Sequence, residues 1–236
     1  MKKSNNPTKP ENQNIGSWVI LKNNQFIIFN KPATLPIQAD KTGDKSLLDL
    51  AEIYTKQKLF LCNRIDRPAS GIVIFAKTSR ALAHLNEQIK ERKVSKTYLA
   101  VTKSPVKEKE GHLINLVEKN QKVNKSYIVE DEGPQSKKAE LYYKVINSSD
   151  NYALLEVNLI TGRHHQIRVQ LSEIGHPIKG DVKYGDRRSN KDKSIHLHAW
   201  KMSFTHPISG EKIDLEAKIP DESLWNYFAE GLEQKA

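Results

Sequence analysis

Two β-runs separated by a short polar turn constrain the fold of this chain more than any other stretch. AELYYKVI (139–146) and YALLEVNLI (152–160) are rich in β-branched and aromatic residues, and SSDN (148–151) lies between them. This arrangement predicts an antiparallel hairpin. A second hairpin is predicted in WVILKNNQFIIFN (18–30), because Asn23 and Asn24 tolerate the positive φ of a tight turn. Further strands are expected at 59–62, 72–76, 97–102, 112–117, 126–130, 196–204 and 211–217.

Helical spacing of apolar residues predicts four helices, at about 46–54, 78–89, 163–175 and 221–232. Ser46 and Asp49 resemble a capping box, and Asp221 is expected to cap the last helix. The third helix is expected to begin near Arg163 and to end at Gly175, a typical C-terminal signal. With no fixed repeat and no internal linker, the chain is predicted to form one α+β domain over residues 15–236. Its core is expected to be a mixed, mostly antiparallel sheet.

Composition limits the classes of protein to which the chain can belong. It has 236 residues, with 38 Lys and Arg against 28 Asp and Glu, a net charge of +10. That excess predicts a polyanionic partner, with nucleic acid ahead of a membrane surface; a merely basic, soluble protein is the plain alternative. Residues 1–14 contain too few apolar side chains to fold, so a flexible arm is expected there.

The cysteine content and the absence of a targeting signal indicate in which cellular compartment the protein works. Cys62 is the single cysteine, which excludes an intramolecular disulfide and favours a reducing environment. The basic N-terminus has no apolar segment behind it, and no run of eighteen apolar residues occurs in the chain. We therefore expect a cytoplasmic protein without a membrane anchor.

The segment LCNRIDRPASGIVIF (61–75) places one carboxylate, Asp66, between two arginines in a loop that joins two predicted strands. Arg64 and Arg67 favour the ionised form of Asp66, which suits a nucleophile or a base better than a general acid. From this loop alone a structural role is favoured, since Asp66 could cap a turn or pair with a neighbouring arginine.

A second candidate site lies in TGRHHQIRVQ (161–170). On a helix that begins near Arg163, either His164 or His165 shares a face with Arg168. An exposed face composed of Arg163, His164, His165, Gln166 and Arg168 could bind an anion or a carboxylate partner. The alternative is a solvated basic face with no ligand.

Three further features carry possible chemistry. His196 and His198 are two residues apart on a predicted strand and could ligate zinc, but no third ligand is spaced with them, and we expect no metal. Tyr98 could be a core residue or could point into a site. The polar loop at 179–194 is long enough to be functional, and its basic residues include Lys183, Arg187 and Arg188.

Two long motifs resemble those of the RluA-type RNA pseudouridine synthases: NRIDRPASGIVIFAK (63–77) and TGRHHQIRVQLSEIGHPIKGDVKYG (161–185). NKPATLPIQ (30–38), SKTYLA (95–100) and LHA (197–199) agree with that family in the same order. The likeness extends from about residue 20 to about residue 217.

This resemblance implies an isomerase that converts uridine in RNA to pseudouridine without a cofactor. The implied fold is a bent, mixed sheet with helices around a central RNA-binding cleft. Asp66 matches the family's catalytic aspartate, Tyr98 its active-site tyrosine, and Arg168 the arginine paired with the aspartate. Arg64 matches the arginine that enters the RNA when the base leaves its stack. The RNA contacts are expected to come from Arg64, Arg67, Arg163, His164, His165, Gln166, Lys183, Arg187 and Arg188.

The sequence departs from the family pattern at two positions and in one module. Asn63 stands where the family commonly has His, and Ala69 stands where it has Thr. Asn63 can still form hydrogen bonds, whereas Ala69 removes a hydroxyl contact. The small N-terminal RNA-binding module of some relatives is expected to be absent. Whether Asp66 attacks C1′, attacks C6 of the base or begins a route through a glycal stays open, and Tyr98 is the candidate for proton transfer.

Other functional classes stay open at this point. An RNA-binding protein that lost catalysis would keep the fold but alter the acid or its partner, and Asp66, Tyr98 and Arg168 are all present. A metal-dependent hydrolase would use His196 and His198. An inert basic scaffold would not need the two motifs. The expected partner is ribosomal or transfer RNA, bound by a monomer that needs no protein partner.

Overall fold

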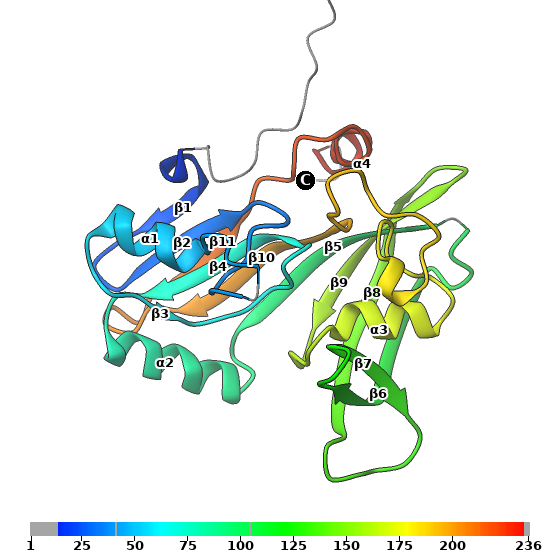
Figure 1. The fold of residues 1–236 in the computed structure, drawn as a ribbon, viewed down its shortest axis with the longest axis horizontal. Coiled ribbons are helices and arrows are strands. Elements are labelled where there is room, and N and C mark those ends of the chain that lie inside the picture. Colours follow the sequence, from blue (N-terminus) through cyan, green and yellow to red (C-terminus); the bar gives the residue numbers. More distant parts are fainter. Residues whose placement is uncertain (1–13, 41, 104, 234–236) are drawn as a thin grey trace, which may run out of the picture.

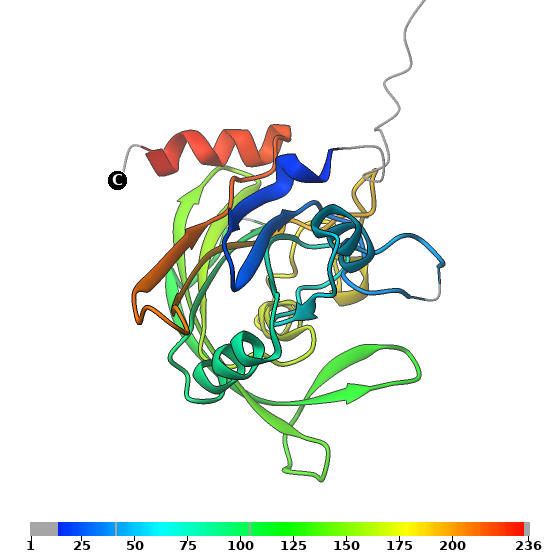
Figure 2. The same ribbon diagram turned by 90° about the vertical axis from the view of Figure 1, so that its left-hand side faces the viewer.

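The computed structural model describes residues 14–40, 42–103 and 105–233. Most of the predicted arm at 1–14 therefore lies outside the described residues. Within them, eleven strands form one sheet and four α-helices surround it (Figures 1 and 2). The strands are β1 (Val19–Lys22), β2 (Phe26–Lys31), β3 (Phe60–Leu61), β4 (Ser70–Ala76), β5 (Ser95–Lys103), β6 (Glu110–Asn120), β7 (Lys125–Val129), β8 (Lys137–Ser148), β9 (Tyr152–Leu159), β10 (Leu197–Thr205) and β11 (Lys212–Glu216). The helices are α1 (Leu47–Thr55), α2 (Ser79–Lys90), α3 (Gln166–Glu173) and α4 (Ser223–Glu233), with 3-10 turns at Ile15–Trp18 and Val182–Tyr184.

The sheet is mixed and mostly antiparallel, as the sequence predicts. Its strand order is β1-β2-β4-β10-β5-β9-β8-β6-β7, with β11 beside β10 and β3 beside β4. Among the described strands, the one parallel pairing joins β4 to β10, where Ser70 faces His198 and Gly71 faces Ala199. Gly71 has a φ of +114°, and a Cβ there would lie 2.3 Å from the Ala199 carbonyl oxygen. Only glycine fits this approach, which sets where β4 begins behind the Asp66 loop.

The two faces of the central strands serve different purposes. Leu99 and Val101 of β5 pack with Trp225 and Phe228 of α4, which covers that face of the sheet. Tyr98 and Ala100 alternate with them and belong to the main core on the other face. The sheet is strongly curved, and α3 lies against β6 and β7 (Figure 1).

Local sequence signals set several element boundaries. The Asn23 side chain accepts hydrogen bonds from the amides of Gln25 and Phe26, which closes the predicted β1–β2 turn. Ser46 and Asp49 form the predicted capping box of α1. In the described part of the chain, no helix is long and apolar enough to cross a bilayer.

Two predicted helix starts were wrong. α3 begins at Gln166 rather than near Arg163, because His165 adopts a left-handed conformation with φ 54° and interrupts the helix there. The face expected to be exposed is therefore divided: Arg163 is exposed in the preceding loop, whereas His165, Gln166 and Arg168 are buried. At α4, the side chain of Glu222 rather than Asp221 accepts from a first-turn amide, that of Leu224.

Candidate active site

The loop between β3 and β4 holds Asp66 in a fixed position. Asn63 anchors the loop to β4, since its amide donates to the Ile72 carbonyl and its oxygen accepts from the Ile74 amide. The Asp66 carbonyl accepts from the Ala69 amide at 3.0 Å. Asn63 thus supplies the hydrogen bonding expected of it. Ala69 is completely buried, so this position is filled by core packing.

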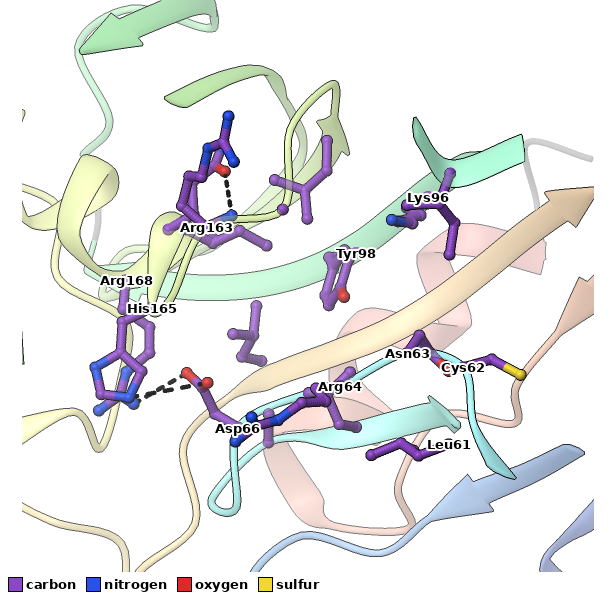
Figure 3. Close-up of a pocket in the computed structure, with 18 residues that line it drawn as sticks. Leu61, Cys62, Asn63, Arg64, Asp66, Lys96, Tyr98, Arg163, His165 and Arg168 are labelled. Atoms are coloured by element: carbon purple, nitrogen blue, oxygen red, sulfur yellow. Dashed lines mark hydrogen bonds and ion pairs between the residues drawn. The ribbon is translucent and has the colours of Figure 1, made fainter. Parts of the chain in front are cut away.

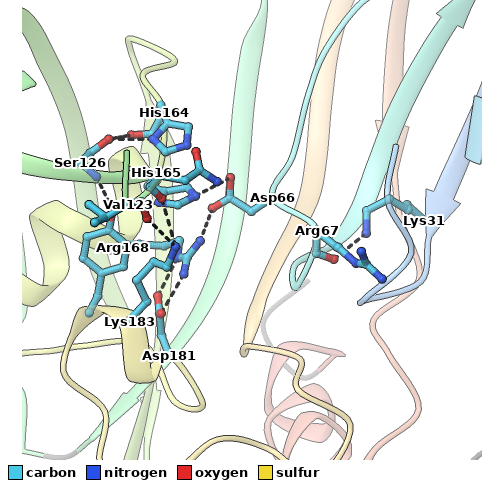
Figure 4. Close-up of polar contacts among 12 residues, drawn as sticks. Lys31, Asp66, Arg67, Val123, Ser126, His164, His165, Arg168, Asp181 and Lys183 are labelled. Atoms are coloured by element: carbon cyan, nitrogen blue, oxygen red, sulfur yellow. Dashed lines mark hydrogen bonds and ion pairs between the residues drawn. The ribbon is translucent and has the colours of Figure 1, made fainter. Parts of the chain in front are cut away.

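A buried lysine supports the same loop from behind. Lys31 of β2 is fully buried, and its ammonium donates to the carbonyl oxygens of Pro32, Leu35 and Arg67 at 2.8–3.1 Å (Figure 4). Burial lowers the pKa of Lys31 to about 7, and the Asp66 charge opposes that shift. Three carbonyls around one ammonium therefore connect the NKPATL segment to the residue next to Asp66.

Asp66 lies at one end of a chain of three charges. Its Oδ2 accepts from Arg168 Nη1 at 3.0 Å, and the same guanidinium donates to both oxygens of Asp181 at 2.6 and 2.8 Å. Arg168 and Asp181 are 5% and 1% exposed, whereas Asp66 keeps 22% of its side chain accessible. Burial opposes the charge on Arg168, but the bonds to Asp181 and the charge of Asp66 outweigh it and raise the arginine pKa. We call these three residues the floor of the site.

The tautomer of His165 follows from a second hydrogen-bonded chain. The Ser126 amide donates to the Tyr184 hydroxyl, which in turn lies 2.8 Å from His165 Nδ1. Within the described residues that nitrogen is the one acceptor for the hydroxyl hydrogen, so the ring hydrogen sits on Nε2. Nε2 lies 3.9 Å from Asp66 Oδ1, beyond hydrogen-bond distance. Burial and the neighbouring Arg168 lower the pKa of His165 to about 2, which keeps the ring neutral.

A cavity of about 350 Å³ opens beside Asp66 (Figure 3). Tyr98 lies along this cavity, and within the described residues its hydroxyl has no hydrogen-bond partner. Burial, and secondly the Asp66 charge, raise the pKa of Tyr98, so its phenol stays protonated. The remaining lining includes Leu61, Cys62, Ile65, Ile89, Lys96, Leu159, Gly162, Ile167 and Leu197. A mostly apolar cavity with an acid at one side suits a planar base of nucleotide size.

Two larger hollows adjoin this cavity and carry basic residues. One, of about 690 Å³, is lined by residues of the Asp66 loop and of the loop before α3, together with Lys119, Asn124 and Lys183. Another of about 410 Å³ extends past Arg163 and His164 toward Lys119 and Lys137. We call Arg64, Lys119, Arg163 and Lys183 the rim. All four are exposed, and no carboxylate among the described residues pairs with any of them.

The family model of RNA pseudouridylate synthase matches residues 25–173 of this chain, which include the Asp66 loop, Tyr98 and Arg168. The chain belongs to this family. It is 34% identical over 208 residues to ribosomal large subunit pseudouridine synthase C of Rickettsia felis, covering 86% of this chain and 68% of the relative. It is 31% identical over 215 residues to an uncharacterized RNA pseudouridine synthase of Mycoplasma genitalium, covering 90% of this chain and 70% of the relative.

A solved structure supports the fold. Human RNA pseudouridylate synthase domain containing 4 superposes with a TM-score of 0.72 at 24% identity, covering 93% of both chains. The resemblance to RluA-type pseudouridine synthases is thus confirmed, and so is the predicted α+β fold. The chain spans roughly two thirds of the length of the curated relatives named above.

The predicted RNA-binding residues of this pseudouridine synthase lie in different environments. Arg64 is exposed beside Asp66 and has no partner in the described ranges. Arg163 donates from Nε to the Lys138 carbonyl, and Lys183 donates to the carbonyls of Val123 and Asn124. His164 bonds through Nδ1 to the Ser126 hydroxyl and is partly exposed.

Four other predicted contacts either have protein partners already or lie outside the three hollows. Gln166 accepts from Thr161 Oγ1 and the Arg163 amide and donates to the Glu140 carbonyl, so its amide organises the loop before α3. Arg67 pairs with Asp40 and Asp44. Arg187 and Arg188 are exposed but line none of the three hollows.

Five residues of the site were missed by sequence reasoning: Lys31, Lys96, Lys119, Asp181 and Tyr184. Asp181 and Tyr184 lie within the second motif, in KGDVKYG, which is the signal that could have found them. By contrast, His196 and His198 have both ring nitrogens hydrogen-bonded, to Asn190 and Glu222 and to Ser70 and the Ala217 carbonyl. That pair supports the packing of α4 through Trp225.

Proposed function

We propose that this pseudouridine synthase isomerises specific uridines of ribosomal or transfer RNA with Asp66 as its catalytic group. The observation that carries the proposal is the Asp66 carboxylate, held against the 350 Å³ cavity by an arginine that Asp181 fixes from behind. An ionised carboxylate that is positioned in advance can act as nucleophile or base without reorganisation.

The reaction breaks the bond from C1′ to N1 of uracil and forms a bond from C1′ to C5, after which C5 loses its proton and N1 gains one. No atoms or electrons are added, so the proposal requires no cofactor and no metal. The base must leave its stack to reach Asp66, and Arg64, which is exposed beside the cavity, is the candidate to fill the gap that the base leaves. Tyr98 packs against the base and is the candidate for the proton transfer. Its phenol is protonated, so it gives its proton to N1 and then, as phenolate, accepts the proton that leaves C5.

The rim supports binding to the RNA backbone. Phosphate contacts by Arg64, Lys119, Arg163 and Lys183 would position the strand across the cavity, and recognition would depend on the shape of the folded RNA. Relatives are named for the ribosomal large subunit, which favours ribosomal RNA, and transfer RNA stays the second candidate. We further propose that the protein acts as a cytoplasmic monomer without a protein partner.

Tritium release from RNA labelled at C5 of uridine tests the proposal. Unmodified transfer and ribosomal RNA are assayed separately with the intact protein and with Asp66→Asn, which keeps the size of the side chain but removes its charge. Release by the intact protein alone is expected, with RNA binding preserved in the variant. Turnover by Asp66→Asn would remove Asp66 from its role, and no release by the intact protein from either RNA would favour a binding protein on this fold.

A further inference from the structure

Lys96 is a half-buried lysine that points into the cavity and has no assigned role. It precedes Tyr98 by two residues on β5, so both side chains lie on the same face of the strand. Figure 3 shows Tyr98 between Asp66 and Lys96, with the ammonium at the end of the cavity away from the acid. Lys96 has no hydrogen bond or ion pair with any described residue.

Arg64 and Arg163 line this cavity as part of the rim, and three of its other polar side chains already have hydrogen-bond partners. Asn63 uses both its oxygen and its amide on β4. Gln166 uses its oxygen and its amide on the loop before α3, and Arg168 bridges Asp66 and Asp181. At the end away from Asp66, the side-chain donors that keep free hydrogens are therefore the Tyr98 hydroxyl and the Lys96 ammonium.

The chemistry of uracil indicates what such a donor would contact. Attack at C6 moves electrons onto O4, and cleavage of the bond from C1′ to N1 leaves its electron pair on the base, shared by O2 and O4. Both routes therefore place negative charge on a carbonyl oxygen of the base. A cation fixed near that oxygen stabilises the charge as it develops, where it contributes most to the rate.

Resting on the proposed function, we infer that Lys96 is a catalytic residue of this site. Its ammonium donates to a carbonyl oxygen of the flipped uracil, at the edge of the base remote from Asp66, and stabilises the charge that accumulates there. Asp66 and Lys96 thereby act on the two ends of one substrate, with Tyr98 between them.

The surroundings of Lys96 support this role over a structural one. Burial lowers the pKa of its ammonium, as expected for a cation that has given up water without gaining a carboxylate. A structural lysine in that position would be expected to carry a partner, as Lys31 does with its three carbonyls. Gly162 lies beside it: a Cβ there would be 4.0 Å from Nζ, and a longer side chain would compete with the base for this space.

Lys96→Met tests the inference, because it removes the charge and keeps the apolar stem. Since no described group would lose a partner, the variant is expected to fold, and thermal unfolding checks this; Lys96→Gln provides a second variant. Lys144→Met, on an exposed position of β8, is the matched control for the loss of one positive charge. Single-turnover tritium release at saturating protein and the RNA Kd are measured for each.

We expect Lys96→Met to slow the saturated rate by about 10²-fold, the size typical of a lost oxyanion donor. Its Kd should change little, and the Lys144 control should match the intact protein. An unchanged rate in Lys96→Met would overturn this inference alone. A weakened Kd with an unchanged saturated rate would show a backbone contact and also overturn it. No release by the intact protein would overturn the proposed function and this inference with it.

Thio-substituted RNA supplies a readout that a structural role would not move. Sulfur is a weaker acceptor than oxygen, so either 2-thiouridine or 4-thiouridine at the target should slow the intact protein. The same substitution should have a much smaller effect on Lys96→Met, since the contact is already absent. Equal slowing of both proteins by both substitutions would contradict a contact between Lys96 and the base.

Discussion

The floor and the rim of the cleft differ in whether their positive side chains are paired with carboxylates. On the floor, Arg168 is 5% exposed and bonds to two carboxylates, Asp66 and Asp181. On the rim, the exposed cations bond only to backbone carbonyls or to no described group. The floor therefore fixes the position of one reactive carboxylate, whereas the rim leaves its charge available for phosphates. We therefore expect the fixed carboxylate of the floor to support catalysis and the unpaired cations of the rim to support RNA binding.

Arg67 shows that the division depends on partners rather than on residue type. It flanks Asp66 as Arg64 does, and both line the 690 Å³ hollow. Asp40 and Asp44 neutralise Arg67, while Arg64 has no such partner in the described chain. The two arginines of NRIDR are thus expected to contribute differently to RNA binding, although the sequence presents them symmetrically.

The largest effect is expected from breaking the floor at Arg168. Arg168→Met leaves the buried Asp181 carboxylate without a partner, which should lower the free energy of unfolding by about 3–5 kcal/mol and abolish turnover. Urea unfolding monitored by circular dichroism measures the first effect. Arg168→Lys is the control, since it keeps a charge but cannot bridge both carboxylates as the planar guanidinium does. Its free energy of unfolding should lie between those of the intact protein and Arg168→Met. A loss below about 1 kcal/mol would contradict a buried, paired floor.

Acid should lower the free energy of unfolding through His165, whose Nε2 lies 3.9 Å from Asp66 Oδ1. Because its folded pKa of about 2 lies below the unfolded value, the unfolded chain alone binds a proton between these values, and stability falls as the pH drops below 6.5. Between pH 6.5 and 4.5 this contribution amounts to about 2–3 kcal/mol. In His165→Asn the decline in unfolding free energy should be smaller by that amount. Identical pH dependence in the two proteins would show that His165 is not held neutral.

The smallest effect, on the rim, separates the two arginines of the loop. Arg64→Gln should weaken RNA binding severalfold and reduce the slope of log K against log salt by about 1. Arg67→Gln should leave the slope nearly unchanged, because Asp40 and Asp44 already neutralise that charge. Filter binding across a salt series measures both slopes. Equal slopes for the two variants would show that carboxylate pairing does not decide which cations bind RNA.

Local patterns predicted much of the scaffold but only part of the site. The Asn23 turn, the Ser46 capping box and the 139–160 hairpin depend on neighbouring residues, and the structure contains all three. The pairing of Asp66 with Arg168 was predicted only from the resemblance to a family, because 102 positions separate the two residues in the sequence. No local pattern relates them, because Asp66 precedes β4 and Arg168 follows β9, two strands that β10 and β5 separate in the sheet.

The missed features are all tertiary. α3 begins three residues later than predicted because His165 is left-handed, and the Gln166 side chain ties the loop before it to Thr161 and Glu140. Asp40 lies 27 positions from Arg67, so the sequence alone could not show that Arg67 is neutralised. In the sequence, Lys31 is one residue of the NKPATLPIQ motif. The three carbonyls around its ammonium are brought together only by folding, so the motif could not predict them.

The division between floor and rim is tested most directly by separating rate from affinity on one RNA. The saturated single-turnover rate and the Kd are measured for the intact protein, Asp66→Asn and Arg64→Gln with the RNA class that releases tritium. We predict that Asp66→Asn loses the rate and keeps the Kd, while Arg64→Gln weakens the Kd more than it slows the saturated rate. An Asp66→Asn variant that binds poorly but still turns over at saturation would contradict the account.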